Sequence, residues 1–127
     1  METVRVGTYF QSAEFGADSV DQLPGIGALV ALFLDPMRTA FGACTIVSGR
    51  RSDAKNDAVG GAPESRHLYH RRPLQVAADV TFARGSSRDW ADFARRRARA
   101  LGRGGVGFYA THVHVDLGSE REWKTSS

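Results

Sequence analysis

The 127-residue chain has a single cysteine, Cys44, and lacks long apolar runs. One cysteine excludes an intramolecular disulfide framework and any zinc site made of several cysteines, so a metal would have to be held by His, Asp or Glu. No apolar run approaches the roughly 20 residues that span a bilayer. The N-terminus lacks a basic segment followed by an apolar core, as a signal peptide has. We therefore expect synthesis in the cytoplasm without a signal peptide, and no membrane partner.

Internal repeats, low-complexity tracts and interdomain linkers are also missing, and the length suits one core. We expect residues 1–127 to form a single domain that is a monomer. Hydrophobic residues at 42% and charged residues at 24% are ordinary globular values, so neither a disordered chain nor a membrane protein is suggested. The formal net charge is +3, with much of the excess in Arg50-Arg51, Arg71-Arg72 and residues 95–103. This basic character favours anionic partners, including nucleic acid and acidic wall polymers.

A long helix is predicted over residues 21–41, where apolar side chains recur at steps of three and four. These side chains are Leu23, Ile26, Leu29, Val30, Phe33, Leu34 and Met37. Pro36 is expected to break the helix into two pieces, with Asp35 capping the second. Another helix is predicted after Ser86, because Asp89 three residues on completes a capping pattern. The first helix would be scaffold, and the arginine-rich face of the second would be solvated.

Four strands are predicted, and the first is rich in small and β-branched residues and stopped by Gly49. They lie near residues 43–48, 76–82, 106–110 and 112–117. A short helix is predicted at residues 51–59, and residues 120–127 are predicted to be a tail. Together these elements predict an α+β fold, with an antiparallel sheet, helices packed on one side and a metal site on the open face.

All four histidines lie in two stretches, residues 65–79 and 112–116. Alternate residues of a strand share a face, so His112, His114 and Asp116 would point the same way. A solvent-exposed strand face explains that run alone equally well. Adding His67 and Asp79 favours zinc, because a catalytic zinc commonly takes two nitrogen donors and one carboxylate oxygen from protein.

Several short motifs follow one another along the chain. They are Ser48-Gly49-Arg50-Arg51-Ser52, Asn56, Gly60-Gly61-Ala62-Pro63, Ser65-x-His67, Ala77-Ala78-Asp79, Gly104-Gly105-Val106-Gly107 and His112-x-His114-x-Asp116. Over residues 12–118 the chain resembles the zinc D-Ala-D-Ala carboxypeptidase family, peptidoglycan peptidases of the VanY and phage-endolysin type. That family lies within the larger group that also holds lysostaphin and the hedgehog signalling domain.

The resemblance implies a role for each matching residue. His67, Asp79 and His114 would be the zinc ligands. Arg51 would receive a peptide carboxylate, and Ser65 would support the metal-binding loop. These roles imply Zn2+ as cofactor and a peptidoglycan stem peptide as substrate.

The loop between His67 and Asp79 departs from the family pattern Ser-x-His-x-x-Gly-x-Ala-x-Asp. It is longer here and lacks the glycine, so we expect an insertion within residues 70–76. The insertion brings His70, which is an alternative ligand or a residue at the mouth of the site. We prefer His67, because Ser65-x-His67 keeps the register of the motif.

The general base is a second departure, because Thr111 occupies a position where many relatives have a carboxylate. His112 matches the first histidine of the family's His-x-His, which polarises or protonates the reacting centre. Asp116 is the nearest carboxylate and is alternatively a residue that orients a histidine ligand. Both catalytic candidates, His112 and Asp116, stay open at this point.

The sequence thus predicts a zinc-dependent peptidoglycan peptidase, a D,D-carboxypeptidase or endopeptidase of the phage or prophage endolysin type that reaches the wall after lysis. The alternative is a zinc-containing binding module of the same fold without turnover, which the threonine at position 111 would permit. Nucleic-acid binding by the arginine helix is not expected, because neither interleaved aromatics nor a recognised motif accompany the charge.

Overall fold

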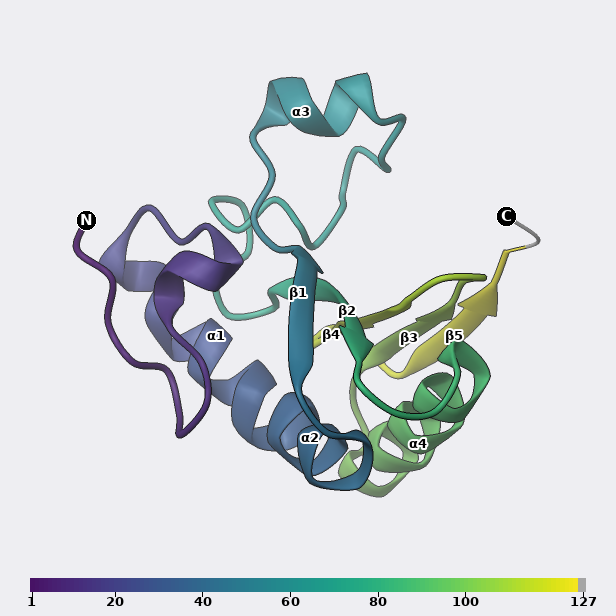
Figure 1. The fold of residues 1–127 in the computed structure, drawn as a ribbon. Helices are drawn as coiled ribbons and strands as arrows, with labels where there is room; N and C mark the ends of the chain where they lie inside the picture. The colour runs from purple at the N-terminus through teal and green to yellow at the C-terminus, as the bar shows by residue number, and fades with distance from the viewer. Residues whose placement is uncertain (126–127) are drawn as a thin grey trace.

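The computed structural model describes residues 1–125 and places a long N-terminal helix and α4 against one face of a five-stranded sheet, whereas the short helix α3 lies on the other side (Figure 1). The helices are α1 (Leu23–Leu29), α2 (Asp35–Phe41), α3 (Asp53–Ala58) and α4 (Ser87–Leu101), and the strands are β1 (Cys44–Ser48), β2 (Ala77–Phe82), β3 (Gly105–Phe108), β4 (Val113–Asp116) and β5 (Arg121–Lys124). Short 3-10 turns at Ser12–Phe15 and Val20–Gln22 precede α1. The predicted α+β class is confirmed.

The sheet has the strand order β1-β2-β4-β3-β5. The first four strands pair antiparallel, whereas β5 runs parallel to β3 with Gly105 opposite Arg121 and Gly107 opposite Trp123. The sheet is therefore mixed, and the prediction of a purely antiparallel sheet was wrong. The predicted tail at residues 120–127 was also wrong for residues 121–124, which form the edge strand β5, and residues 126 and 127 lie outside the described residues.

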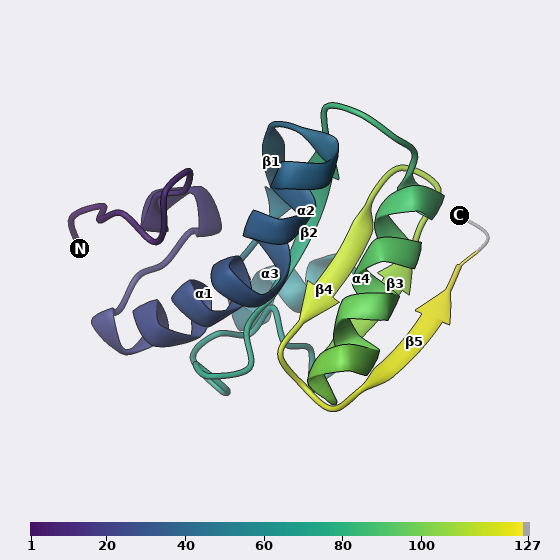
Figure 2. The same ribbon diagram turned by 90° about the horizontal axis from the view of Figure 1, so that it is seen from below.

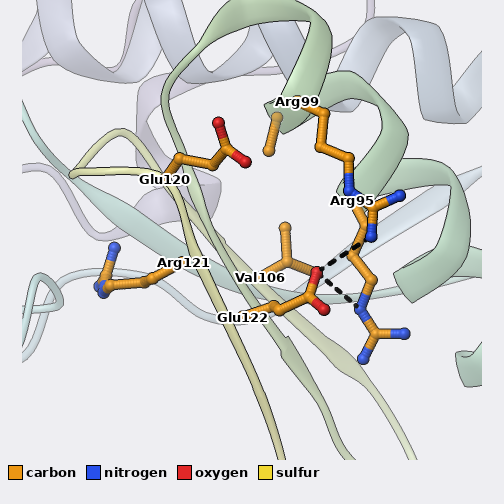
Figure 3. A pocket seen from close by; sticks show the side chains of 7 residues that line it. Arg95, Arg99, Val106, Glu120, Arg121 and Glu122 are labelled. Atoms are coloured by element: carbon orange, nitrogen blue, oxygen red, sulfur yellow. Dashed lines mark ion pairs between the residues drawn. The ribbon is translucent and has the colours of Figure 1, made fainter.

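The strand β5 pairs with β3, and its Glu122 also forms ion pairs with α4. Glu122 lies between two arginines of α4 at the rim of a cavity of about 230 Å³ (Figure 3). Its Oε2 lies 3.6 Å from Arg95 Nε and 3.6 Å from Arg99 Nη2. Arg-Glu-Trp-Lys has no alternation of apolar and polar residues, so pairing with β3 and these contacts determine its conformation.

The helix over residues 20–41 continues through Pro36, and the predicted break with an Asp35 cap was wrong. Leu34 and Asp35 keep right-handed helical backbone angles, and a π-helical segment at Val30–Leu34 joins α1 to α2. A proline leaves the carbonyl four residues earlier, that of Leu32, without its helical donor. Arg97 of α4 supplies a replacement, because its Nε donates to the Leu32 carbonyl over 3.0 Å.

This helix also has the length and apolar character of a membrane-crossing helix, with a mean hydropathy of 1.2 over its most apolar window. Composition alone therefore leaves such a span open, contrary to the expectation from run lengths. In the fold its apolar face lies in the core, where Ile26, Leu29 and Phe33 are fully buried. Figure 2 shows α4 crossing the sheet over β3 and β4, and the long helix contacts α4 through α2 and the π-helical segment.

Candidate metal centre and cavity

Two histidines and an aspartate from separate parts of the chain meet on the open face of the sheet. His67 lies on the loop before β2, Asp79 on β2 and His114 on β4, and one ligand atom of each lies within 4.8 Å of the others. Asp79 and His114 are direct cross-strand partners, which brings their side chains together on one face. Asp79 Oδ1 lies 3.2 Å from His67 Nε2 and 3.0 Å from His114 Nδ1.

The second ring nitrogen of each histidine fixes which nitrogen faces Asp79. His67 Nδ1 lies 2.8 Å from the Gly49 carbonyl, an acceptor, so Nδ1 carries the proton and Nε2 presents a lone pair. His114 Nε2 lies 2.8 Å from Asp116 Oδ2, so its lone pair is at Nδ1 when the ring is neutral. Three electron-pair donors therefore converge, and this set of two nitrogens and one oxygen fits zinc, with a fourth position open to the cavity.

Protons compete with a metal ion for these three ligand atoms. Burial lowers the pKa of His114, but hydrogen bonds to Asp116 and Asp79 outweigh burial and raise it overall. For Asp79, burial raises the pKa, yet hydrogen bonds from His114 and His67 hold it well below its usual range. Since a ligating imidazole must be neutral, a metal here would displace protons, and its affinity would fall as the pH falls.

Asp116 is fully buried and has its carboxylate oxygens occupied. Oδ1 accepts from the backbone N–H groups of Gly105 (3.0 Å) and Gly118 (2.9 Å), and Arg121 donates to both oxygens at 3.0 and 2.7 Å. Burial raises its pKa, but the bonds from His114 and Arg121 outweigh burial and hold it low. These contacts favour the orienting role for Asp116 over the general base.

His112 precedes β4 and lies near the three grouped side chains. Its Nε2 is 4.0 Å from Asp79 Oδ2, and its ring stacks on Tyr109 at 4.5 Å between centroids. Nδ1 lies 3.2 Å from the Thr111 hydroxyl. Burial is the main cause that lowers its pKa, despite the charge of Asp79, so the neutral imidazole is favoured at neutral pH.

Arg51 and Ser65 both lie close to His67. Arg51 Nη2 is 3.5 Å from Asp79 Oδ2, and its backbone N–H donates to the His67 carbonyl over 2.7 Å. Ser65 Oγ accepts from the His67 backbone N–H over 3.2 Å, so it shapes the loop that carries His67. Both side chains line the cavity above the histidines.

His70 points away from the grouped ligands and pairs with Asp53, Nε2 to Oδ1, at 3.1 Å. The predicted insertion, residues 70–76, packs on α1 at Gly25, where a Cβ would overlap the Pro73 carbonyl oxygen. Within residues 1–125, the cavity lining includes none of residues 70–76. The structure therefore places His67 in the candidate metal site and leaves His70 outside it.

A cavity of about 600 Å³ opens above this site, and part of its wall was missed by the sequence analysis. The missed lining residues are Arg66, Tyr109, Arg121 and Trp123. The Trp123 ring lies 5.0 Å from that of His114, and its Nε1 donates to the Tyr109 hydroxyl over 3.1 Å. A Cβ at Gly107 would lie 2.6 Å from the Trp123 ring, so glycine there allows this packing. The four-residue β5 carried no pattern that could have revealed Trp123.

Two imidazoles and one carboxylate below an open cavity are the ligand set of a zinc hydrolase. The Peptidase M15 family model matches residues 8–116, and the chain belongs to this family, the zinc D-Ala-D-Ala carboxypeptidases. The resemblance predicted from the motifs is thereby confirmed, and the chain is a metallopeptidase of a family that acts on cell-wall peptides. No curated protein and no solved structure matched the chain. The match ends at Asp116, before β5.

Proposed function

We propose that this protein is a zinc-dependent peptidase that hydrolyses an amide bond in peptidoglycan stem peptides. The convergence of His67 Nε2, Asp79 Oδ1 and His114 Nδ1 at the base of the cavity carries the proposal. These three residues would hold the metal. When bound, zinc supplies Lewis-acid chemistry, because it polarises a carbonyl and lowers the pKa of water toward about 7.

The chain's own side chains bind the peptide and move protons. Arg51 donates two parallel hydrogen bonds to a substrate carboxylate, a geometry that lysine cannot match. His112, whose neutral form is favoured, takes a proton at Nε2 and delivers it to the leaving amine. Asp116 keeps the Nε2 proton of His114 in place, and Trp123 covers one side of the site.

The endolysin-type role is also part of the proposal. The net charge of +3 would favour contact with acidic wall polymers after release by host lysis. Both a carboxypeptidase and an endopeptidase fit the cavity, because Arg51 can bind a terminal or a side-chain carboxylate.

The test is digestion of purified peptidoglycan by the zinc-loaded protein, with mass spectrometry of the released muropeptides. We expect new amine and carboxyl ends at one peptide bond, with loss of a terminal residue for a carboxypeptidase and separated peptides for an endopeptidase. Zinc content is measured on the same sample. Stoichiometric zinc without cleavage would instead support the inactive binding module, which the threonine at position 111 permits.

A further inference from the structure

Arg66 is a guanidinium in the cavity wall that the roles above do not use. It directly precedes His67, and its side chain is 17% exposed. Within residues 1–125 the guanidinium makes no hydrogen bond, and its buried Nε has only a 4.0 Å ion-pair contact with Asp116 Oδ1. Burial of a guanidinium without an acceptor is unfavourable, because the group loses its hydrogen bonds to water. An anionic ligand atom would replace these hydrogen bonds.

The neighbouring carboxylates are already engaged. Asp116 Oδ1 is 4.0 Å from Arg66 Nε, beyond hydrogen-bond range, and it accepts from Arg121 and two backbone N–H groups. Glu64, another residue of the cavity wall, bonds to Arg72 at 2.9 Å. The guanidinium of Arg66, a residue of the cavity wall, therefore keeps its hydrogen-bond donors unused.

The surroundings of Arg66 position its side chain. A Cβ at Gly118 would overlap Arg66 Nε, so glycine at that position leaves the space that the guanidinium occupies. The Arg66 carbonyl accepts from the Ala77 backbone N–H over 3.2 Å, which ties the residue to the start of β2. A side chain held in this way loses little rotamer freedom when it binds an anion.

Arg66 and Arg51 lie on different sides of His114. Arg51 approaches Asp79, which faces His114 Nδ1, whereas Arg66 approaches Asp116, which bonds to His114 Nε2 on the other side of the ring. We propose that Arg66 binds a second carboxylate of the peptide, so that the enzyme selects acidic peptides with free carboxylates on both sides of the scissile amide. This inference rests on the proposed function, because the carboxylate belongs to a peptide bound across the metal site.

The experiment compares two synthetic stem pentapeptides that differ only in whether the glutamyl carboxylate is free or amidated. The zinc-loaded protein is mixed with each, and binding is followed before turnover by the change in tryptophan fluorescence, to which Trp123 contributes from the cavity wall and Trp90 from the core. We expect the free acid to bind roughly tenfold or more tightly, the scale of a charge-assisted bidentate pair. Arg66→Met should abolish this preference with little effect on the amidated peptide. Arg71→Met, which removes an exposed arginine outside the cavity wall, should retain it.

Equal binding of the two peptides by the wild-type protein would overturn the inference, as would a preference that survives Arg66→Met. If Arg66→Met does not fold, the comparison of the two peptides with the wild-type protein still tests the inference. Arg66→Lys gives a second test, because it should show a reduced preference for the free acid. Cleavage is followed by mass spectrometry in the same mixtures. A preference for the free acid without cleavage of either peptide would sustain the acidic-peptide site and reject the proposed hydrolysis.

Discussion

At the scale of single residues, the environment of each polar side chain separates roles that residue type leaves open. Asp116 and His112 were both candidates for proton transfer. Asp116 is fully buried with its oxygens occupied, whereas His112 keeps Nε2 4.0 Å from Asp79 Oδ2 at the metal site. These surroundings support the proposal that His112 is the proton-transfer group.

His112→Ala is predicted to retain stoichiometric zinc and lose roughly 100-fold or more in turnover, the scale of general acid–base catalysis. Zinc is retained because His112 lies outside the three grouped ligands. Metal analysis and kcat on a cleaved stem peptide check this. His70→Ala, which alters an exposed histidine, is the control and should keep both. Near-normal turnover in zinc-replete His112→Ala would move the role to another group.

Arg51→Lys is predicted to keep the fold and the zinc but to raise KM roughly tenfold, because an ammonium cannot form the two parallel bonds of a guanidinium. Arg50→Lys is the matched control, since Arg50 Nε donates to the Gly16 carbonyl at 2.8 Å. Steady-state kinetics on a peptide with a free carboxylate give the comparison. Unchanged KM in Arg51→Lys would reject carboxylate binding by this residue.

Cys44 is predicted to be inert in the folded protein. The pKa of its thiol is raised to about 12, mainly by burial, compared with about 8.5 for a free thiol. Labelling by a thiol reagent at pH 8 should therefore be roughly a thousandfold slower than in denaturant. Because the folded pKa is the higher one, this group also removes stability as the pH rises above about 8.5. Equal labelling rates in the folded and the denatured protein would contradict the prediction that Cys44 is inert.

At the scale of elements, β5 extends the site beyond the residues matched by the family. Arg121 of this strand binds Asp116 through two bonds, and Asp116 binds the ring of His114. The strand also contributes Trp123 to the cavity wall. A segment predicted to be a tail thus orients a predicted metal ligand.

A double-mutant cycle tests this connection. Asp116→Asn is predicted to weaken zinc binding about 10- to 100-fold, and Arg121→Met to weaken it less. In combination, Arg121→Met should add little to Asp116→Asn, because it acts through Asp116. Chelator competition measures all three affinities, with Lys124→Met, an exposed residue of the same strand, as the control. Strictly additive losses would show that Arg121 acts independently of Asp116.

At the scale of the whole molecule, the candidate metal site joins a loop and two central strands. A ligand that binds the folded state at 100 times its Kd stabilises it by about 2.7 kcal/mol. Chelation of zinc is therefore predicted to lower Tm by roughly 5–15 °C in calorimetry. His67→Ala should lose this zinc-dependent shift, and His70→Ala should keep it. The reverse result would place His70 in the metal site.

The sequence by itself determined the α+β class, the family and the candidate ligands His67, Asp79 and His114. These depend on local signals, namely the 3.6-residue apolar period, alternation on a strand and motifs with fixed spacing. Such local patterns can be read from the sequence because they do not depend on how the elements pack against one another.

Only the tertiary structure decided the continuity of the helix at Pro36, the parallel strand β5, the place of the residue 70–76 insertion and the orienting contacts of Asp116. Each depends on partners distant in sequence: Arg97 supplies the donor for Leu32, and α4 arginines hold Glu122. Arg121 and Trp123 reach the site because β5 pairs with β3. Hydrogen bonds and ion pairs between separate elements produce no periodic pattern in the sequence, so these contacts could not be predicted from the sequence alone.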